Sequence, residues 1–147
     1  MPRTLITLHL LLLAGCAEST PGHSAEGSIR EMLELSAAAW NAGDLDGFMS
    51  SYAPDSNTTF VGHRELLRGY DVIEANYAPL FEPGATRDSL RFEDMSIHMI
   101  DPLHAVGYAR WVLVRDGEPW RSGPFTLVVE RRGTNWFIIH DHSSEEN

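Results

Sequence analysis

Two histidines near the C-terminus, His140 and His142, are the residues whose type and spacing most directly allow chemistry. One residue separates them in a β-prone segment, and alternate residues of a strand face the same side. Both imidazoles should therefore share a face with Trp136 and Ile138, while Asp141 points the other way. Imidazole titrates near physiological pH, so either histidine is a candidate general base or hydrogen-bond partner for a small polar ligand.

Arg110 is the candidate cation of the same site. It lies two residues after Tyr108, so both side chains should share one strand face, which we expect to be the concave side of the sheet. A buried guanidinium needs a carboxylate, a ligand or water as its partner. If Glu74 or Asp94 is that partner, the arginine is structural. Without a carboxylate, an anionic or carbonyl-bearing ligand is expected.

Two other interpretations of the His-x-His pair stay open. The pair could supply two metal ligands, but His63, His98 and His104 are scattered and form no second cluster at ligand spacing. We therefore expect no metal and no cofactor. Alternatively, the imidazoles hydrogen-bond to helix ends and to Ser143 or Ser144, which would fix the end of the strand. The sequence contains no Gly-rich phosphate loop, nucleophile elbow or Cys/His pair.

Aromatic side chains are expected to form the apolar wall of such a site. A pocket that combines them with an arginine and two histidines would suit a flat or carbonyl-bearing organic molecule. The expected ligand-binding residues are Arg110, His140, His142, Tyr108, Trp40 and Tyr52.

Periodicity predicts the helices that must position these residues. Apolar residues recur at three- and four-residue spacing from Ile29 to Trp40, which predicts a helix of about four turns that begins near Ser28. Asp44 can cap a second, shorter helix. A third helix is expected over residues 70–80, before the prolines that follow.

Strands are expected in the rest of the chain. Period-two patterns or β-prone residues predict them over 58–61, 90–100, 105–115, 120–131 and 135–142, with a hairpin turn at residues 116 and 117. Helices followed by a long antiparallel sheet indicate an α+β fold.

The last strands are apolar on both faces, although three modest helices can cover only one. We expect the uncovered face to bind a second copy of the chain. The residues expected on that face are Trp111, Leu113, Phe125, Leu127, Val129, Phe137 and Ile139.

The N-terminus predicts export and a lipid anchor. A short apolar run follows Arg3 and is far below the roughly 20 residues that span a bilayer, so residues 1–15 are expected to be a signal peptide. The run ends in a Leu-Ala-Gly-Cys sequence that resembles the lipobox of bacterial lipoproteins, with Cys16 as the lipidated residue. Residues 16–27 then form a flexible tether, and residues 28–147 form one domain.

This organisation places the domain in the bacterial cell envelope, where the lipidated cysteine attaches it to a membrane and the domain faces the periplasm or the exterior. The formal charge of the chain is −10, which disfavours binding to nucleic acid.

The pattern over residues 28–144 resembles the nuclear transport factor 2-like superfamily, and within it the SnoaL-like domains. The resemblance is carried by the helix end at residues 40–48, the Arg-Gly-Tyr helix start at 68–70 and the closing segment 135–144. It implies a cone, in which a curved antiparallel sheet wraps around N-terminal helices, encloses a mostly apolar pocket and dimerises through its outer face.

The resemblance leaves the activity open, because this superfamily includes isomerases, dehydratases, cyclases and binding modules without chemistry. The favoured hypothesis is a lipid-anchored envelope domain that binds a small organic ligand. One alternative is an isomerase, dehydratase or small hydrolase that uses a histidine base, and another is a non-catalytic envelope interaction module.

Overall fold

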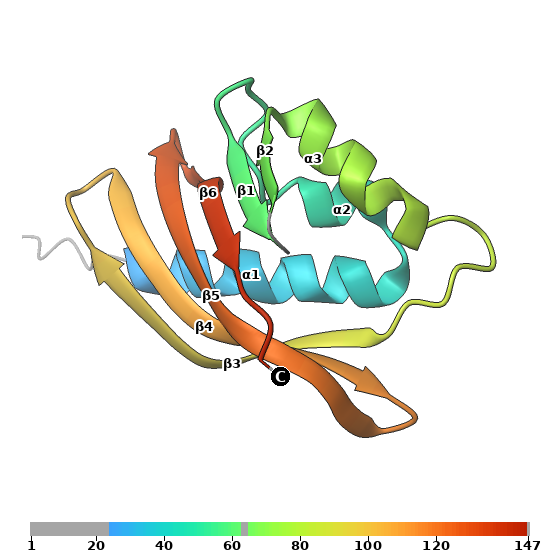
Figure 1. The fold of residues 1–147 in the computed structure, drawn as a ribbon. Helices are drawn as coiled ribbons and strands as arrows, with labels where there is room; N and C mark the ends of the chain where they lie inside the picture. The colour runs from blue at the N-terminus through green and yellow to red at the C-terminus, as the bar shows by residue number, and fades with distance from the viewer. Residues whose placement is uncertain (1–23, 63–64, 147) are drawn as a thin grey trace, which may run out of the picture.

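The computed structural model of the protein describes residues 24–62 and 65–146. Two helices come first, two short strands and a third helix follow, and the four long strands come last, as Figure 1 shows. The helices are α1 (Ala25–Ala42), α2 (Leu45–Met49), α3 (Tyr70–Tyr77) and a short 3-10 helix, η1 (Ala78–Leu80). The strands are β1 (Thr59–Gly62), β2 (Glu65–Arg68), β3 (Ser89–Met99), β4 (His104–Arg115), β5 (Glu118–Arg132) and β6 (Asn135–Ser143).

The strands form one six-stranded sheet in the order β2-β1-β6-β5-β4-β3. The expected α+β class is confirmed, and the sheet is mostly antiparallel with one parallel pair, β1 with β6. Strand β2 was not predicted from the sequence. It is only four residues long and three of them are exposed, so it carries no periodic apolar signal. The long strands bend as they pass α1 (Figure 1).

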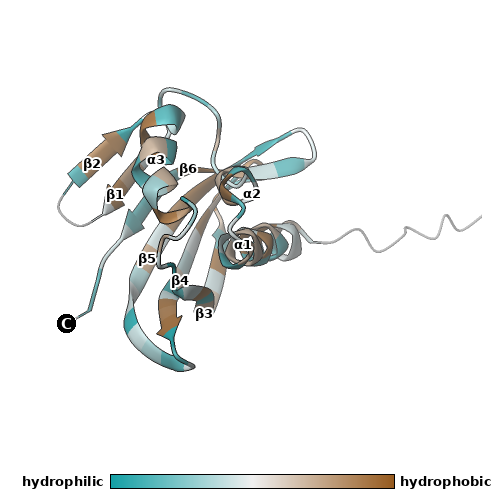
Figure 2. Cartoon of the chain, turned by 90° about the vertical axis from the view of Figure 1, so that its right-hand side faces the viewer, coloured by the Kyte–Doolittle hydropathy of each residue, from teal (hydrophilic) through white to brown (hydrophobic). Residues whose placement is uncertain are grey.

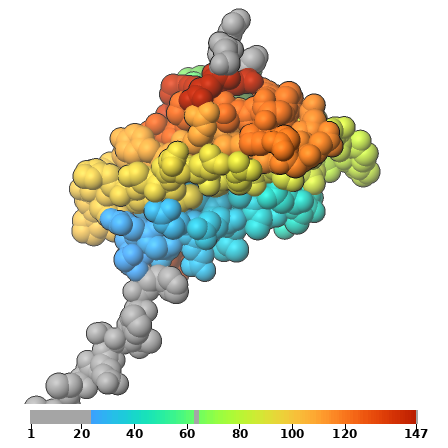
Figure 3. All heavy atoms as spheres, turned by 90° about the horizontal axis from the view of Figure 1, so that it is seen from below, coloured from blue at the N-terminus to red at the C-terminus, as the bar shows by residue number. Residues whose placement is uncertain are grey.

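Helix α1 begins three residues before the predicted start. Ser24 is its N-cap, and the serine hydroxyl accepts a hydrogen bond from the backbone N–H of Gly27 at 3.1 Å. The helix ends where Gly43 adopts a left-handed conformation, with a φ of 79°. Seen from below, α1 lies along β3 (Figure 3). Its Ile29 and Leu33 are buried in the core.

The C-terminal end of α1 is fixed to the start of β3 by polar contacts. The Asn41 side chain donates to the carbonyl of Leu90 at 2.8 Å and accepts from its N–H at 2.7 Å. The Trp40 indole N–H donates to the carbonyl of Asp88 at 2.8 Å. These bonds hold the Trp40 ring in one orientation between the helix and the sheet.

Halfway along β3, the residues that face inward change from one alternating set to the other. Its pairing with β4 shifts between Glu93 and Ser96, and Asp94 has a φ of 53°. Phe92 packs on the core before this bulge, and Met95 and Ile97 pack on it afterwards. A bulge adds one residue to a strand, reverses the alternation and increases the local twist. This is one source of the bend in the sheet.

Most of the residues that we expected on the outer face of the sheet lie inside the cone instead. Phe125, Leu127 and Val129 are buried in the core, and Trp111 and Leu113 face the inside of the cone. Both residue sets of these strands are apolar, so alternation could not show which set faces the helices (Figure 2).

Of the residues assigned to that face, Phe137 and Ile139 lie outside the core. Tyr108 of β4 is 50% exposed. The apolar surface of the outer face is therefore smaller than the sequence suggested.

The residues that predict a signal peptide and a lipid anchor, including Cys16, lie outside the described residues. Within residues 24–62 and 65–146, no helix combines the length and apolar character needed to cross a membrane.

Two leucines of α1 test whether the helix is held by its buried face. Leu33 is 2% exposed and Leu35 is 62% exposed. We expect Leu33→Ala to lower the free energy of unfolding by about 2–5 kcal/mol. The matched Leu35→Ala should change it by less than about 0.5 kcal/mol. Urea unfolding monitored by circular dichroism measures both, and equal losses would contradict the packing described.

Candidate functional site

A cavity of about 520 Å³ lies between the helices and the concave side of the sheet. Leu33 of α1 and Leu127 of β5 contribute to its walls, and most of the lining residues are apolar. The aromatic residues that line it, here called the aromatic wall, are Trp40, Phe48, Tyr52, Phe60, Tyr77, Phe92, Trp111 and Phe125. Several of these rings pack edge to face, as Trp40 and Tyr77 do at an interplanar angle of 89°.

The polar centre of the cavity is the carboxyl group of Asp141, which is only 6% exposed. The Tyr52 hydroxyl donates to its Oδ2 at 2.7 Å. The Ser143 hydroxyl donates to its Oδ1 at 2.9 Å. Each carboxylate oxygen therefore has one neutral hydroxyl donor, and each can accept a further hydrogen bond.

Tyr52 reaches this carboxyl group because the segment after α2 pairs with β6. The Ile138 N–H donates to the Ser51 carbonyl at 2.8 Å, and the Ala53 N–H donates to the Ile138 carbonyl at 2.9 Å. Tyr52 forms an isolated parallel bridge with Ile138 between these bonds. The backbone therefore fixes the phenol beside the strand that carries Asp141.

A bulge in β6 turns Asp141 towards the cavity. Val129 of β5 pairs with Ile138, but Val128 pairs with His140, so Ile139 is an extra residue. Ile138 faces the core before the bulge, and Asp141 faces the cavity after it. The predicted orientation was therefore wrong: regular alternation would have placed His140 inside and Asp141 outside.

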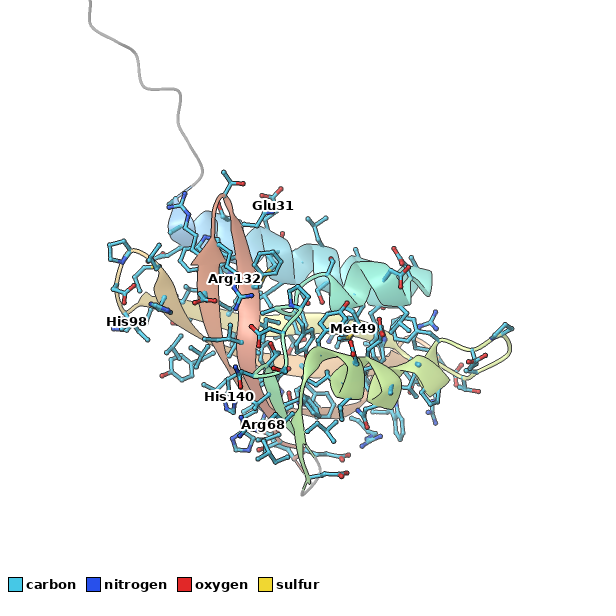
Figure 4. All side chains as sticks on the ribbon, turned by 90° about the horizontal axis from the view of Figure 1, so that it is seen from above. Glu31, Met49, Arg68, His98, Arg132 and His140 are labelled. Carbon is cyan, nitrogen blue, oxygen red and sulfur yellow. The ribbon has the colours of Figure 1, made fainter. Side chains whose placement is uncertain are left out.

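His140 and His142 are not among the residues that line the cavity. The His140 ring shares a hydrogen bond with the Thr59 hydroxyl through Nδ1 at 2.7 Å. Pairing across the strands places Arg68, Thr59 and His140 in one row, and Figure 4 shows Arg68 and His140 on the same side of the molecule. His142 is exposed. The partner of His140 is thus a neighbouring strand, not the expected helix end or serine.

Arg110 also lies outside the cavity lining. Its guanidinium donates to Glu146 through two nitrogens, one of them at 2.7 Å, and to the Ser122 hydroxyl at 2.7 Å. The expected partners Glu74 and Asp94 were therefore wrong, and a residue of the C-terminal segment takes their place. Because a carboxylate satisfies the guanidinium, Arg110 has a structural partner.

Two of the six expected ligand-binding residues, Trp40 and Tyr52, line the cavity. The other four do not line it: Tyr108, Arg110, His140 and His142. Sequence analysis missed Asp141 as a cavity residue. The run of adjacent apolar residues Ile138 and Ile139 interrupts simple alternation, and this was the available signal of a bulge.

The C-terminal segment forms part of the cavity rim. Ser144 and Glu145 line the cavity, and the Glu145 carboxylate accepts from Nε and Nη2 of Arg121 at 2.7 and 2.6 Å. This segment crosses β5 at Gly123, where an added Cβ would lie 1.9 Å from the Ser144 carbonyl oxygen. Glycine at position 123 therefore allows the rim to close against the strand.

Burial controls the protonation of the site. It raises the pKa of Asp141 to about 6, although the hydrogen bonds from Tyr52 and Ser143 act in the opposite direction. Burial and the Asp141 charge raise the pKa values of Tyr52 and Tyr77, so both phenols stay neutral at physiological pH. Outside the cavity, burial and the neighbouring His142 lower the pKa of His140.

Metal binding finds no ready site in the part of the chain that the structure describes. Within it, no three histidine, cysteine, aspartate or glutamate side chains are grouped so that they could hold an ion.

Comparison with protein families matches residues 29–145 to a model of the SnoaL-like domain. No match was found among curated proteins. The sequence match therefore covers nearly all of the described residues and extends from α1 to the C-terminal rim.

Solved structures show the same fold. An NTF-2-like protein of unknown function from Shewanella oneidensis MR-1 is 30% identical, with a TM-score of 0.72, over 80% of this chain and 96% of that chain. An NTF2-like superfamily protein from Salmonella enterica serovar Typhimurium LT2 is 22% identical, with a TM-score of 0.69, over 83% and 91% of the two chains. A putative calcium/calmodulin-dependent protein kinase II association domain from Xanthomonas campestris is 18% identical, with a TM-score of 0.66, over 87% and 92%.

Asp141→Asn tests the cost of burying this carboxyl group. Because burial raises the pKa of Asp141 from 3.8 to about 6, the folded state binds this proton more tightly than the unfolded chain does. The resulting stabilisation is complete below the unfolded pKa and is lost as the pH rises through the folded pKa. The loss amounts to roughly 3 kcal/mol for a shift of about two pKa units.

Asparagine cannot ionise, so the variant should be more stable than the wild type at about pH 8 by up to that amount, with little gain near pH 4. Urea unfolding at both pH values measures the difference. A variant that is equally destabilised at both would show that hydrogen bonding to the carboxylate outweighs the cost of its burial.

Proposed function

The chain belongs to the SnoaL-like domain family of the nuclear transport factor 2-like superfamily, and from this premise we propose that it binds a small organic molecule inside its cone. The observation that carries the proposal is the cavity itself. It has a volume of about 520 Å³, walls that are mostly apolar and rich in aromatic rings, and, among the described residues, one buried carboxyl group, that of Asp141. Ligand sites usually have this composition, with apolar walls and few polar groups.

The volume favours a ligand-binding domain over an envelope interaction module with a vestigial pocket. Sites for small molecules occupy roughly 300–1,000 Å³. The cavity lies well inside this range. The aromatic rings of the wall pack on one another around the space instead of filling it.

Proton-transfer catalysis is the second candidate function, and Asp141 replaces the histidines as its base. A general base works best when its pKa lies near the working pH. Burial holds the pKa of Asp141 at about 6, and the group lines the cavity that a substrate would enter. The alternative of an isomerase, dehydratase or hydrolase is therefore retained with this carboxylate in place of His140 or His142.

Native mass spectrometry of the protein purified from its own host tests the binding proposal. We expect an added mass that is released on denaturation and then identified in the small-molecule fraction. Leu90→Trp introduces a large ring into the cavity lining and should abolish the added mass. Leu35→Trp places the same ring on the exposed face of α1 and should leave it unchanged. Wild-type protein without any bound mass, even after incubation with host extract, would count against the proposal.

The same spectra report the oligomeric state. We also propose a homodimer through the outer face of the sheet, supported by the exposed Tyr108 and by Phe137 and Ile139 outside the core. No helix of the described residues covers most of that sheet face, and a second copy would remove its apolar atoms from water.

We further propose that lipidation of Cys16 anchors the domain to a membrane of the cell envelope. The support is the Leu-Ala-Gly-Cys sequence after a short apolar run. A diacylglyceryl group buries many methylene groups, each of which contributes about 0.8 kcal/mol to membrane binding.

Cys16→Ala should move the protein from the detergent phase to the aqueous phase after cloud-point separation of cell extracts. Loss of the thiol removes the attachment point for the lipid, whereas Ser19→Ala keeps it and serves as the matched control. An alanine variant that still enters the detergent phase would contradict lipid anchoring.

A further inference from the structure

We infer that the ligand of the cavity is an organic cation, with an ammonium-type nitrogen beside Asp141 and an apolar body against the aromatic wall. This inference rests on the proposed function, because it names the chemical class of the molecule in the same cavity. It follows from the charges that line the cavity and from the partners that each of them already has.

The cavity lining has an excess of negative charge. Among the described residues that form it are three carboxylates, Glu65, Asp141 and Glu145, and one guanidinium, Arg121. Arg121 and Glu145 pair with each other through two hydrogen bonds of 2.7 and 2.6 Å. The pair cancels its own charge at the rim, so the described lining residues leave no unpaired guanidinium for the inner carboxylate.

Among the residues that the structure describes, the side chains that hydrogen-bond to Asp141 are neutral donors. Tyr52 and Ser143 each donate one hydroxyl hydrogen bond to it. Hydrogen bonds orient a carboxylate but leave its charge in place, and a buried charge without a counterion is costly. A cationic ligand would supply that counterion, and the carboxylate oxygens still have lone pairs to accept its N–H or N–CH groups.

The aromatic wall fits the same ligand class. The faces of aromatic rings attract cations, by about 0.5–1 kcal/mol at exposed sites and about 2 kcal/mol or more when desolvated. Trp40, Trp111 and Tyr77 are among the rings that line the cavity. The formal charge of −10 on the chain also favours the approach of cations over anions.

Ligands of the other charge types fit this geometry less well. The Tyr52 hydroxyl already donates its proton to Asp141, so it has no second proton for a ligand carbonyl. An anion would be placed against the unneutralised carboxylate in a site of low polarity, where repulsion is strong.

Three probes with one shape and different charges test the inference. We would titrate the purified full chain at about pH 8 with 1-aminoadamantane, 1-adamantanol and adamantane-1-carboxylate, using isothermal titration calorimetry. The ammonium should bind about tenfold or more tightly than the alcohol, because it adds the charge interaction to the same apolar contact. The carboxylate should bind most weakly.

Two variants that each remove one negative charge test whether the preference for the ammonium depends on Asp141. Asp141→Asn should bring the ammonium and the alcohol to similar affinities. Asp101→Asn removes the same charge from an exposed turn outside the cavity and should keep the wild-type preference. Equal or tighter binding of the alcohol or the carboxylate by the wild type overturns the cation inference and leaves the proposed function intact. Absence of binding by all three probes counts against both.

The pH dependence of the wild type gives a test that needs no variant. Protonation of Asp141 removes its charge, so the ammonium affinity should fall by up to about tenfold per pH unit below the pKa near 6. A flat profile between about pH 5 and pH 8 would overturn the inference.

The other groups around Asp141 fit this reading. Tyr52 and Tyr77 stay neutral throughout this range. Arg121 and Glu145 are paired with each other at the rim. The remaining titratable groups nearby are Glu65 on β2 and His142, which is on the same strand as Asp141. Any pH dependence that persists in Asp141→Asn would come from a group other than Asp141.

Discussion

The curvature of the sheet around α1 is the constraint on which the rest of the structure depends. A regular strand alternates its residues strictly, so its inner set is fixed from end to end. Here the register shifts in β3 near Asp94, between Leu113 and Val114 of β4, and in β6 at Ile139. The shifts in β3 and β6 each add a residue to the strand, so they increase its local twist and change which residues lie inside the cone. The register shifts that curve the sheet therefore also determine which side chains face the cavity.

The shift in β6 links the fold to the site most directly. The residues before it, Trp136 and Ile138, complete the hydrophobic core. The residues after it, Asp141 and Ser143, line the cavity, to which Ile138 also contributes. One added residue thus allows an apolar side chain before it and polar side chains after it to face the same interior. Burial of the carboxyl group that results raises its pKa, so the folded state disfavours its charged form.

Much of the fold followed from the sequence, because its signals are local. The helical spacing from Ile29 to Trp40, the Asp44 cap and the Asp-Gly hairpin each depend on a few neighbouring residues, and each appears in the structure. The site did not follow, since it depends on register between distant strands. Asp141 required the bulge opposite Val128, and the partner of Arg110 is separated from it by 36 residues.

Several arginines form ion pairs that join segments at the surface of the fold and at the rim of the cavity. Arg115 pairs with Asp88 at 2.8 Å, and Arg132 pairs with both Asp55 and Glu130. Arg110 and Arg121 bind the C-terminal segment, through Glu146 and Glu145. Each of these guanidiniums joins segments at the surface or the rim, where water limits the cost of a charge. These four arginines therefore hold outer segments of the fold together, whereas the buried Asp141 carboxyl group accepts hydrogen bonds from the hydroxyls of Tyr52 and Ser143.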